Sequence, residues 1–262
     1  REFAVRTGLP SRAPADYEHI ELTEVPPAWV WLDTDVATWS ASRGGVSVDA
    51  VNGVGPVLRF EVERRSDLYG VRLDLDAERL EWGGSVTLSL YPADGTGMLE
   101  VEFDAHGGDG ELYRRVSALH SAVSVPDTDP NGVHPVRLQL SYDRQRQARH
   151  AEGWMDGERL LNHEQAFTLA GDRMIVSVRL PPSAQVDGAS VRLLLHSIEL
   201  FGLVPTGRVL EAPERTPAEN RAVSMLAVRR NPASQPGLDT ADAARAIDTV
   251  FRSQMYMHPG DT

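Results

Sequence analysis

The sequence predicts an all-β fold in which two antiparallel sheets pack face to face as a β-sandwich. Three observations predict it. Short runs of alternating apolar and polar residues fill the middle of the chain, as in strands that bury one face and expose the other. Gly, Pro, Asp and Asn separate these runs. No long segment with the 3.6-residue period of a helix interrupts the region, so the crossover helices of a parallel sheet are missing.

Five runs show the alternation most clearly. In the first, Leu58, Phe60 and Val62 alternate with charged residues, and the other four repeat the pattern. The five runs cover residues 58–63, 71–76, 86–90, 136–142 and 174–180. Turn sequences fall at residues 83–84, 92–95, 107–110, 156–157 and 187–188. This spacing predicts about ten strands over residues 20–203.

The two ends of the chain differ in composition from the middle and predict arms. Residues 1–19 form an irregular N-terminal arm, residues 20–203 the sandwich, and residues 204–262 an extended C-terminal arm with one or two short helices. Asp239 or Thr240 is suited to cap one such helix. That helix would present an apolar stripe for docking on a protein partner, made of Ile247, Val250, Phe251 and Met255.

Composition narrows the range of partners and compartments. The 262 residues carry a net charge of −12, so the surface repels nucleic acid and anionic membranes. The absence of cysteine excludes disulfides and cysteine-ligated metals. No apolar run approaches the roughly 20 residues that span a bilayer. All 26 basic residues are arginine, which favours a GC-rich bacterial source, and we expect a periplasmic, envelope-associated or secreted protein.

Two segments carry a family resemblance. The hairpin VRLQLSYDRQRQARHAEGWMDGERLL (136–161) and the closing strand VRLLLHSIELFG (191–202) resemble the concanavalin A-like lectin/glucanase superfamily, which includes the laminin-G-like domains. The resemblance implies a two-sheet jelly roll. It also implies a domain that binds glycans or proteins, and in some members hydrolyses β-glucans.

The stretch LEVEFDAH (99–106) has acids at every second position, namely Glu100, Glu102 and Asp104. The glucanases of this superfamily carry Glu-x-Asp-x-Glu on one strand, so the resemblance would make these three residues catalytic in an enzyme. Residues four apart on a strand lie about 13 Å apart, and only long side chains that lean together reach the separation of about 5–5.5 Å that retaining hydrolysis needs. This row departs from the glucanase pattern at its middle and last positions, where Glu102 replaces Asp and the shorter Asp104 replaces Glu. The alternation itself predicts that the acids face water. We therefore predict a domain without catalytic residues.

Residues 127–132 match the D-x-D-x-N-G start of a calcium loop, with Asp127, Asp129 and Asn131 as the ligands. Leu138 stands where an EF-hand has its bidentate glutamate, which excludes an EF-hand. A calcium site in a sandwich loop and a simple Asx turn remain the two alternatives. No histidine pair has the spacing of a zinc site, and the sequence predicts no other cofactor.

Tryptophans are candidate platforms for sugar rings, because their large apolar faces carry a polar N–H at one edge. We take Trp29, Trp31 and Trp154 as the candidate ligand-binding residues. The alternative is that they belong to the core, where large aromatic residues are commonly found.

These observations predict a non-catalytic interaction module. Its function would be that of an accessory subunit that docks through its arms on a larger extracytoplasmic or membrane-associated assembly. A lectin-like carbohydrate-binding module is the first alternative, with a glycan as the ligand. A glycoside hydrolase of the β-glucanase type is the second.

Overall fold

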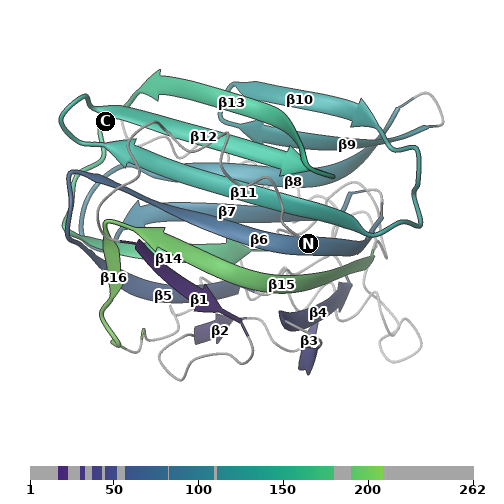
Figure 1. The fold of residues 1–262 in the computed structure, drawn as a ribbon, viewed down its shortest axis with the longest axis horizontal. Coiled ribbons are helices and arrows are strands. Elements are labelled where there is room, and N and C mark those ends of the chain that lie inside the picture. Colours follow the sequence, from purple (N-terminus) through teal and green to yellow (C-terminus); the bar gives the residue numbers. More distant parts are fainter. Residues whose placement is uncertain are drawn as a thin grey trace, which may run out of the picture.

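The protein is a sandwich of two antiparallel sheets, as the sequence predicts (Figure 1). The structure, a computed structural model, describes residues 17–22, 30–32, 37–42, 45–51, 57–81, 83–108, 111–179, 190–208 and 210. These residues form sixteen strands. Within the same residues, no helix is long and apolar enough to cross a membrane. Most of both predicted arms, including the docking residues Ile247, Val250, Phe251 and Met255, lies outside the described residues.

Sheet I forms one layer, in the order β13-β12-β11-β6-β15-β4-β3, with β1 paired to β15. The sequence segments that resemble the lectin/glucanase superfamily supply four of its strands, β11, β12, β13 and β15. The strands are β1 (Tyr17–Glu21), β3 (Ala37–Ser42), β4 (Gly45–Val51), β6 (Leu68–Leu80), β11 (His134–Asp143), β12 (Ala148–Met155), β13 (Glu158–Ala166) and β15 (Ser190–Phe201).

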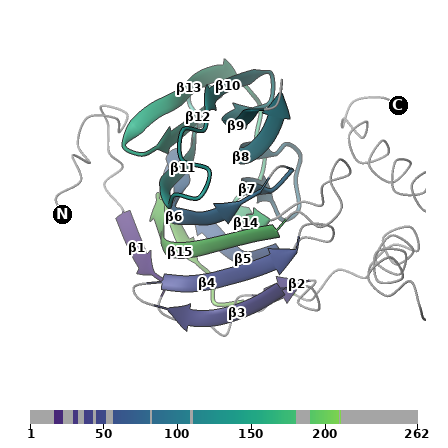
Figure 2. The same ribbon diagram turned by 90° about the vertical axis from the view of Figure 1, so that its right-hand side faces the viewer.

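Sheet II forms the second layer, in the order β10-β9-β8-β7-β14-β5-β16, with β2 paired to β5 (Figure 2). Its central strands β5, β7 and β14 coincide with three of the predicted alternating runs. The strands are β2 (Val30–Leu32), β5 (Val57–Arg64), β7 (Ser85–Pro92), β8 (Leu99–Gly108), β9 (Glu111–Ala118), β10 (Ser121–Pro126), β14 (Arg173–Arg179) and β16 (Leu203–Pro205).

The core lies between the two sheets and is built by the alternation that the sequence shows. Leu99, Val101 and Phe103 of β8 are at most 1% exposed and face the apolar residues of sheet I. Full burial of such a side chain contributes about 1.5–3 kcal/mol. The intervening residues of each strand are thereby placed on the outer faces of the sandwich.

The predicted count of about ten strands is too low, since the described residues contain sixteen. Strand β9 shows one reason. Its Arg114 points toward the interior with Val116 and is 1% exposed, so the strand lacks a clean alternation. Strands β1 and β16 also run across the predicted boundaries between the sandwich and its arms.

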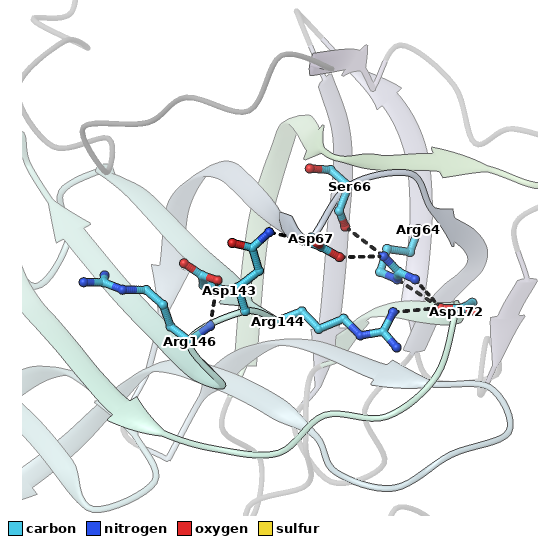
Figure 3. A network of polar contacts seen from close by, with 8 residues as sticks. Arg64, Ser66, Asp67, Asp143, Arg144, Arg146 and Asp172 are labelled. Carbon is cyan, nitrogen blue, oxygen red and sulfur yellow. Dashed lines mark hydrogen bonds and ion pairs between the residues drawn. The ribbon is translucent and has the colours of Figure 1, made fainter.

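A network of ion pairs joins three chain turns at one end of the sandwich (Figure 3). Arg64, which ends β5, donates to Asp172 before β14 at 2.6 Å and to Asp67 before β6 at 3.3 Å. Arg144, in the turn after β11, lies 3.5 Å from Asp172. The hydrogen bond from Arg64 lowers the pKa of Asp172. The network therefore links turns of both sheets and holds the ends of β5 and β14 side by side.

Candidate ligand-binding face

Strand β8 carries the three acids that the sequence singles out. Because they alternate with core residues, Glu100, Glu102 and Asp104 lie together on the outer face of sheet II. A row of small hydroxyl side chains on β7 borders them, with Ser85, Thr87 and Ser89 opposite Asp104, Glu102 and Glu100.

These acids are less exposed than the sequence predicts. Asp104 is only 5% exposed, and Thr87 beside Glu102 is 2% exposed. Burial, followed by repulsion from Asp104 and Glu100, raises the pKa of Glu102. The expectation that all three face open water is therefore wrong for Asp104. The reason is that side chains of the neighbouring strands pack against it.

Asp104 is paired with a cation from the next strand. Arg115 of β9 donates its Nε–H to Asp104 at 2.8 Å, and the Nδ1 of His106 lies 3.4 Å from the other carboxylate oxygen. The ring of His106 stacks on Tyr113, with centroids 5.7 Å apart and planes 24° apart. One end of the acidic row thus combines an ion pair with two stacked, half-buried rings.

The other side of the hydroxyl row carries positive charge. Arg179 of β14 lies opposite Thr87 and donates to Glu100 at 3.3 Å. Arg59 of β5 lies opposite Ser177 of β14. Burial raises the pKa of Tyr91, while the positive charges of Arg59 and Arg179 act to lower it.

The result is a continuous polar surface across five adjacent strands, β5, β14, β7, β8 and β9. Small hydroxyl residues occupy its centre, and charged residues and a tyrosine surround them. We call it the polar face of sheet II, made of Arg59, Ser85, Thr87, Ser89, Tyr91, Glu100, Glu102, Asp104, Arg115, Ser177 and Arg179.

Of the three tryptophan candidates, the structure describes the side chain of Trp154, and it does not join this face. Trp154 of β12 lies between the core-facing residues Gly153 and Met155, so its ring is on the outer face of sheet I. There it contacts Arg137, whose guanidinium carbon is 6.0 Å from the ring centroid. Trp31 belongs to β2, but its side chain is outside the description, as is all of Trp29. Trp154 and the acidic row therefore lie on opposite faces of the sandwich.

The predicted calcium loop is organised by an arginine. The carboxylate of Asp127 is wholly buried, 2.6 Å from Arg114 and 3.5 Å from His134. Its Oδ1 accepts a hydrogen bond from the backbone N–H of Asp129 at 3.0 Å, which forms an Asx turn. Asn131 is exposed. In the part of the chain that the structure describes, no three His, Asp or Glu side chains are grouped to hold a metal ion, and calcium binding stays a prediction.

The outer face of sheet I holds charged residues that the sequence did not single out. Arg72 of β6 is paired with Glu199 of β15, and Glu152 of β12 accepts a hydrogen bond from Gln139 at 3.0 Å. Burial raises the pKa of Glu152. The sequence of one strand does not reveal these pairs, because the two partners lie on different strands that become neighbours only in the folded sheet.

Lectins are among the solved structures that share this architecture. A Bauhinia forficata lectin, solved in complex with GalNAc, is 9% identical, with 73% of this chain and 100% of that chain covered and a TM-score of 0.51. A Lotus tetragonolobus seed lectin is also 9% identical, with coverages of 73% and 99% and a TM-score of 0.50. No family model matches the chain, and no curated protein matches it by sequence. The chain has the concanavalin A-like jelly-roll fold that the sequence resemblance implied.

Replacing Asp127 should destabilise the fold strongly. The substitution D127N leaves the buried guanidinium of Arg114 without its counter-ion, and breaking a buried pair in this way costs about 3–5 kcal/mol. Urea unfolding measures the loss. D129N is the matched control, because Asp129 is exposed and a surface change costs at most about 0.5 kcal/mol. We expect each variant to have the same free energy of unfolding with calcium and with chelator. If both variants lose stability only in the presence of calcium, the loop is a calcium site instead.

Replacing Glu102 should stabilise the fold at neutral pH. Its raised folded-state pKa means that it contributes most stability below its unfolded pKa, a contribution lost as the pH rises through the folded pKa. E102Q removes the charge that burial penalises, so its gain in unfolding free energy should be present at pH 8 and shrink toward pH 4. Urea titrations across this range test it, with the exposed Glu158 changed to Gln as control. An equal gain at every pH would contradict the role of burial.

Proposed function

We propose that this protein is a non-catalytic carbohydrate-binding module whose sugar lies on the polar face of sheet II. The observation that carries the proposal is that partly exposed carboxylate and guanidinium groups, those of Glu100, Arg115 and Arg179, surround the row of small hydroxyl residues. A sugar hydroxyl both donates and accepts hydrogen bonds. Carboxylates accept and guanidinium groups donate, so this face offers both kinds of partner.

The rings at the end of the acidic row add an apolar element. Tyr113 and His106 stack beside Asp104, and an aromatic face combined with nearby polar groups suits a ligand with one apolar and one polar side. The jelly-roll fold also supports the proposal, because a lectin of this fold was solved with GalNAc.

Two features support binding without hydrolysis. About 13 Å of extended strand separates the outer acids Glu100 and Asp104, and Asp104 is one methylene shorter than the glutamate that ends the Glu-x-Asp-x-Glu row of the glucanases. Each also accepts a hydrogen bond from an arginine, Arg179 or Arg115. A pair of carboxylates that must move protons or attack a sugar is better served by free oxygens at closer range.

Filling the centre of the polar face should abolish binding. Ser89 lies at the middle of the hydroxyl row and is 3% exposed, so the ring of S89Y must emerge from the face, where the sugar lies. The thermal unfolding midpoint of S89Y is measured beside that of the wild type, to separate loss of binding from loss of folding. After a glycan array has identified a ligand, calorimetry should show an affinity loss of at least about ten-fold, the equivalent of one charge-assisted hydrogen bond. W154A is the control on sheet I, and its affinity should be unchanged.

If W154A lost affinity for the glycan and S89Y did not, the sugar would lie on sheet I instead. Prolonged incubation with the ligand should release no new reducing ends. Their release by the wild type, and not by E102Q, would show that the protein is a glycoside hydrolase.

Docking through the C-terminal arm on a larger extracytoplasmic assembly is the second candidate. One observation favours it. The arm begins as a strand on β5, and Thr206 then donates its backbone N–H and its hydroxyl to Glu61 at 3.1 Å each. The arm therefore leaves the domain from a fixed point beside the polar face of sheet II.

Truncation after residue 210 separates the two candidates. The shortened chain keeps the buried Leu203 and the contacts of Thr206, so its thermal unfolding midpoint should fall by less than about 4 °C, the shift that 1 kcal/mol produces. Glycan binding should be retained, and a partner cross-linked in the native cell should be lost. Loss of folding would instead make the arm a part of the core.

A further inference from the structure

Two arginines lie close together at one side of the polar face of sheet II. Arg59 of β5 is directly opposite Ser177 of β14, and Arg179 is two residues further along β14. Such diagonal neighbours have Cα atoms about 7–8 Å apart, within reach of long side chains. Both residues alternate with core residues, so both side chains leave the sheet on the same face.

The positive charge of this pair is poorly matched within the domain. Arg179 has one hydrogen bond to a carboxylate, to Glu100 at 3.3 Å, at the long end of the usual range. Among the described residues, Arg59 has no carboxylate within ion-pair distance, and its hydrogen bond goes to the neutral hydroxyl of Tyr91. By contrast, Arg115 on the same face is 2.8 Å from Asp104.

Each of these two guanidinium groups also has an unused donor. The Nε atoms of Arg59 and Arg179 are both buried, and neither has a hydrogen-bond partner. Buried donors in native proteins are nearly always bonded, so two orphaned Nε–H groups on adjacent strands require an explanation. An acceptor that arrives with a ligand would satisfy both.

A ligand reaches this side of the face at the arginines. The side chain of Arg179 is 42% exposed, whereas Ser177 and Ser89, which face each other across β14 and β7, are 5% and 3% exposed. Their hydroxyls, with that of Tyr91, are further donors. A group with two or three negative oxygens matches the fork of N–H groups on each guanidinium.

We propose that the carbohydrate bound by this protein is acidic, and that its carboxylate or sulfate group lies between Arg59 and Arg179 above Ser177. This inference rests on the proposed carbohydrate-binding function and adds the class of sugar. One such group neutralises two adjacent cations and supplies acceptors to both orphaned donors, which a neutral hydroxyl does not do. Glu100 competes for Arg179 in the free protein and moves away from it in the complex.

The test uses pairs of glycans that differ in their acidic group. Calorimetry of the full chain compares polygalacturonate with its methyl ester and glucuronoxylan with xylan for the carboxylate, and κ-carrageenan with chemically desulfated κ-carrageenan for the sulfate. In at least one pair the acidic member should bind about ten-fold more tightly, as expected for a charge-assisted contact. The pair that responds identifies the acidic group.

Variants tie this preference to the two arginines. R59Q and R179Q should each weaken binding of the acidic glycan about ten-fold and weaken binding of its neutral partner by clearly less, so that the preference within the pair shrinks. R146Q removes the same charge from an exposed turn between β11 and β12 (Figure 3) and should have little effect. E100Q should strengthen acidic binding, because it frees Arg179 and removes a competing carboxylate. If R59Q fails to fold, R59K keeps the charge but loses the fork and should give a smaller loss.

Three outcomes would overturn the inference. If the two glycans of every pair bind with equal affinity and neither R59Q nor R179Q changes that affinity, the ligand is not acidic, and the carbohydrate-binding function is unaffected by this result. Losses that are equal for acidic and neutral glycans give the arginines a structural role only. Absence of binding to every glycan, on a broad array as well, removes the inference and the proposed function together.

Discussion

The strict alternation of β8 is the constraint on which the rest of the structure depends. Leu99, Val101 and Phe103 fill the space between the sheets, and removing their apolar surface from water drives the two layers together. Because successive side chains of a strand point to opposite faces, burial of these three residues places the residues between them on the outer face. Glu100, Glu102 and Asp104 must share the outer face, whatever their own electrostatic preference.

The two outer faces differ in how their charged side chains are paired. On sheet I, Arg72 is paired with Glu199, and Glu152 is bonded to Gln139 and Arg159, so charges are matched across neighbouring strands. On sheet II, Asp104 is paired with Arg115 at 2.8 Å, whereas Arg179 reaches Glu100 at 3.3 Å and Arg59 has no carboxylate within ion-pair distance among the described residues. The proposed acidic ligand would supply the negative charge that this side of the sheet lacks.

The sequence predicts what lies within one strand better than what lies between strands. The five alternating runs all correspond to strands, and the acidic row of β8 is visible in the sequence as three acids at every second position. Arg114 escapes this reasoning, because a buried arginine breaks the apolar alternation of β9 and its partner Asp127 follows a different strand. Arg59 and Arg179 are likewise separated by most of the domain in sequence. Only the antiparallel register of β5 with β14 brings them together, and register depends on contacts distant in the chain.

A face assembled across strands also explains how distant relatives in fold can differ in what they bind. Each of β5, β14, β7 and β8 contributes one or more outward side chains to the polar face, while its inward side chains belong to the common core. Outward positions can change without opening a cavity, so selection on binding and selection on folding act on alternate residues of the same strand. The two lectins that are 9% identical to this chain share its architecture and little of its sequence. The chemistry of the ligand is to be sought in this chain's own arginines, hydroxyls and acids.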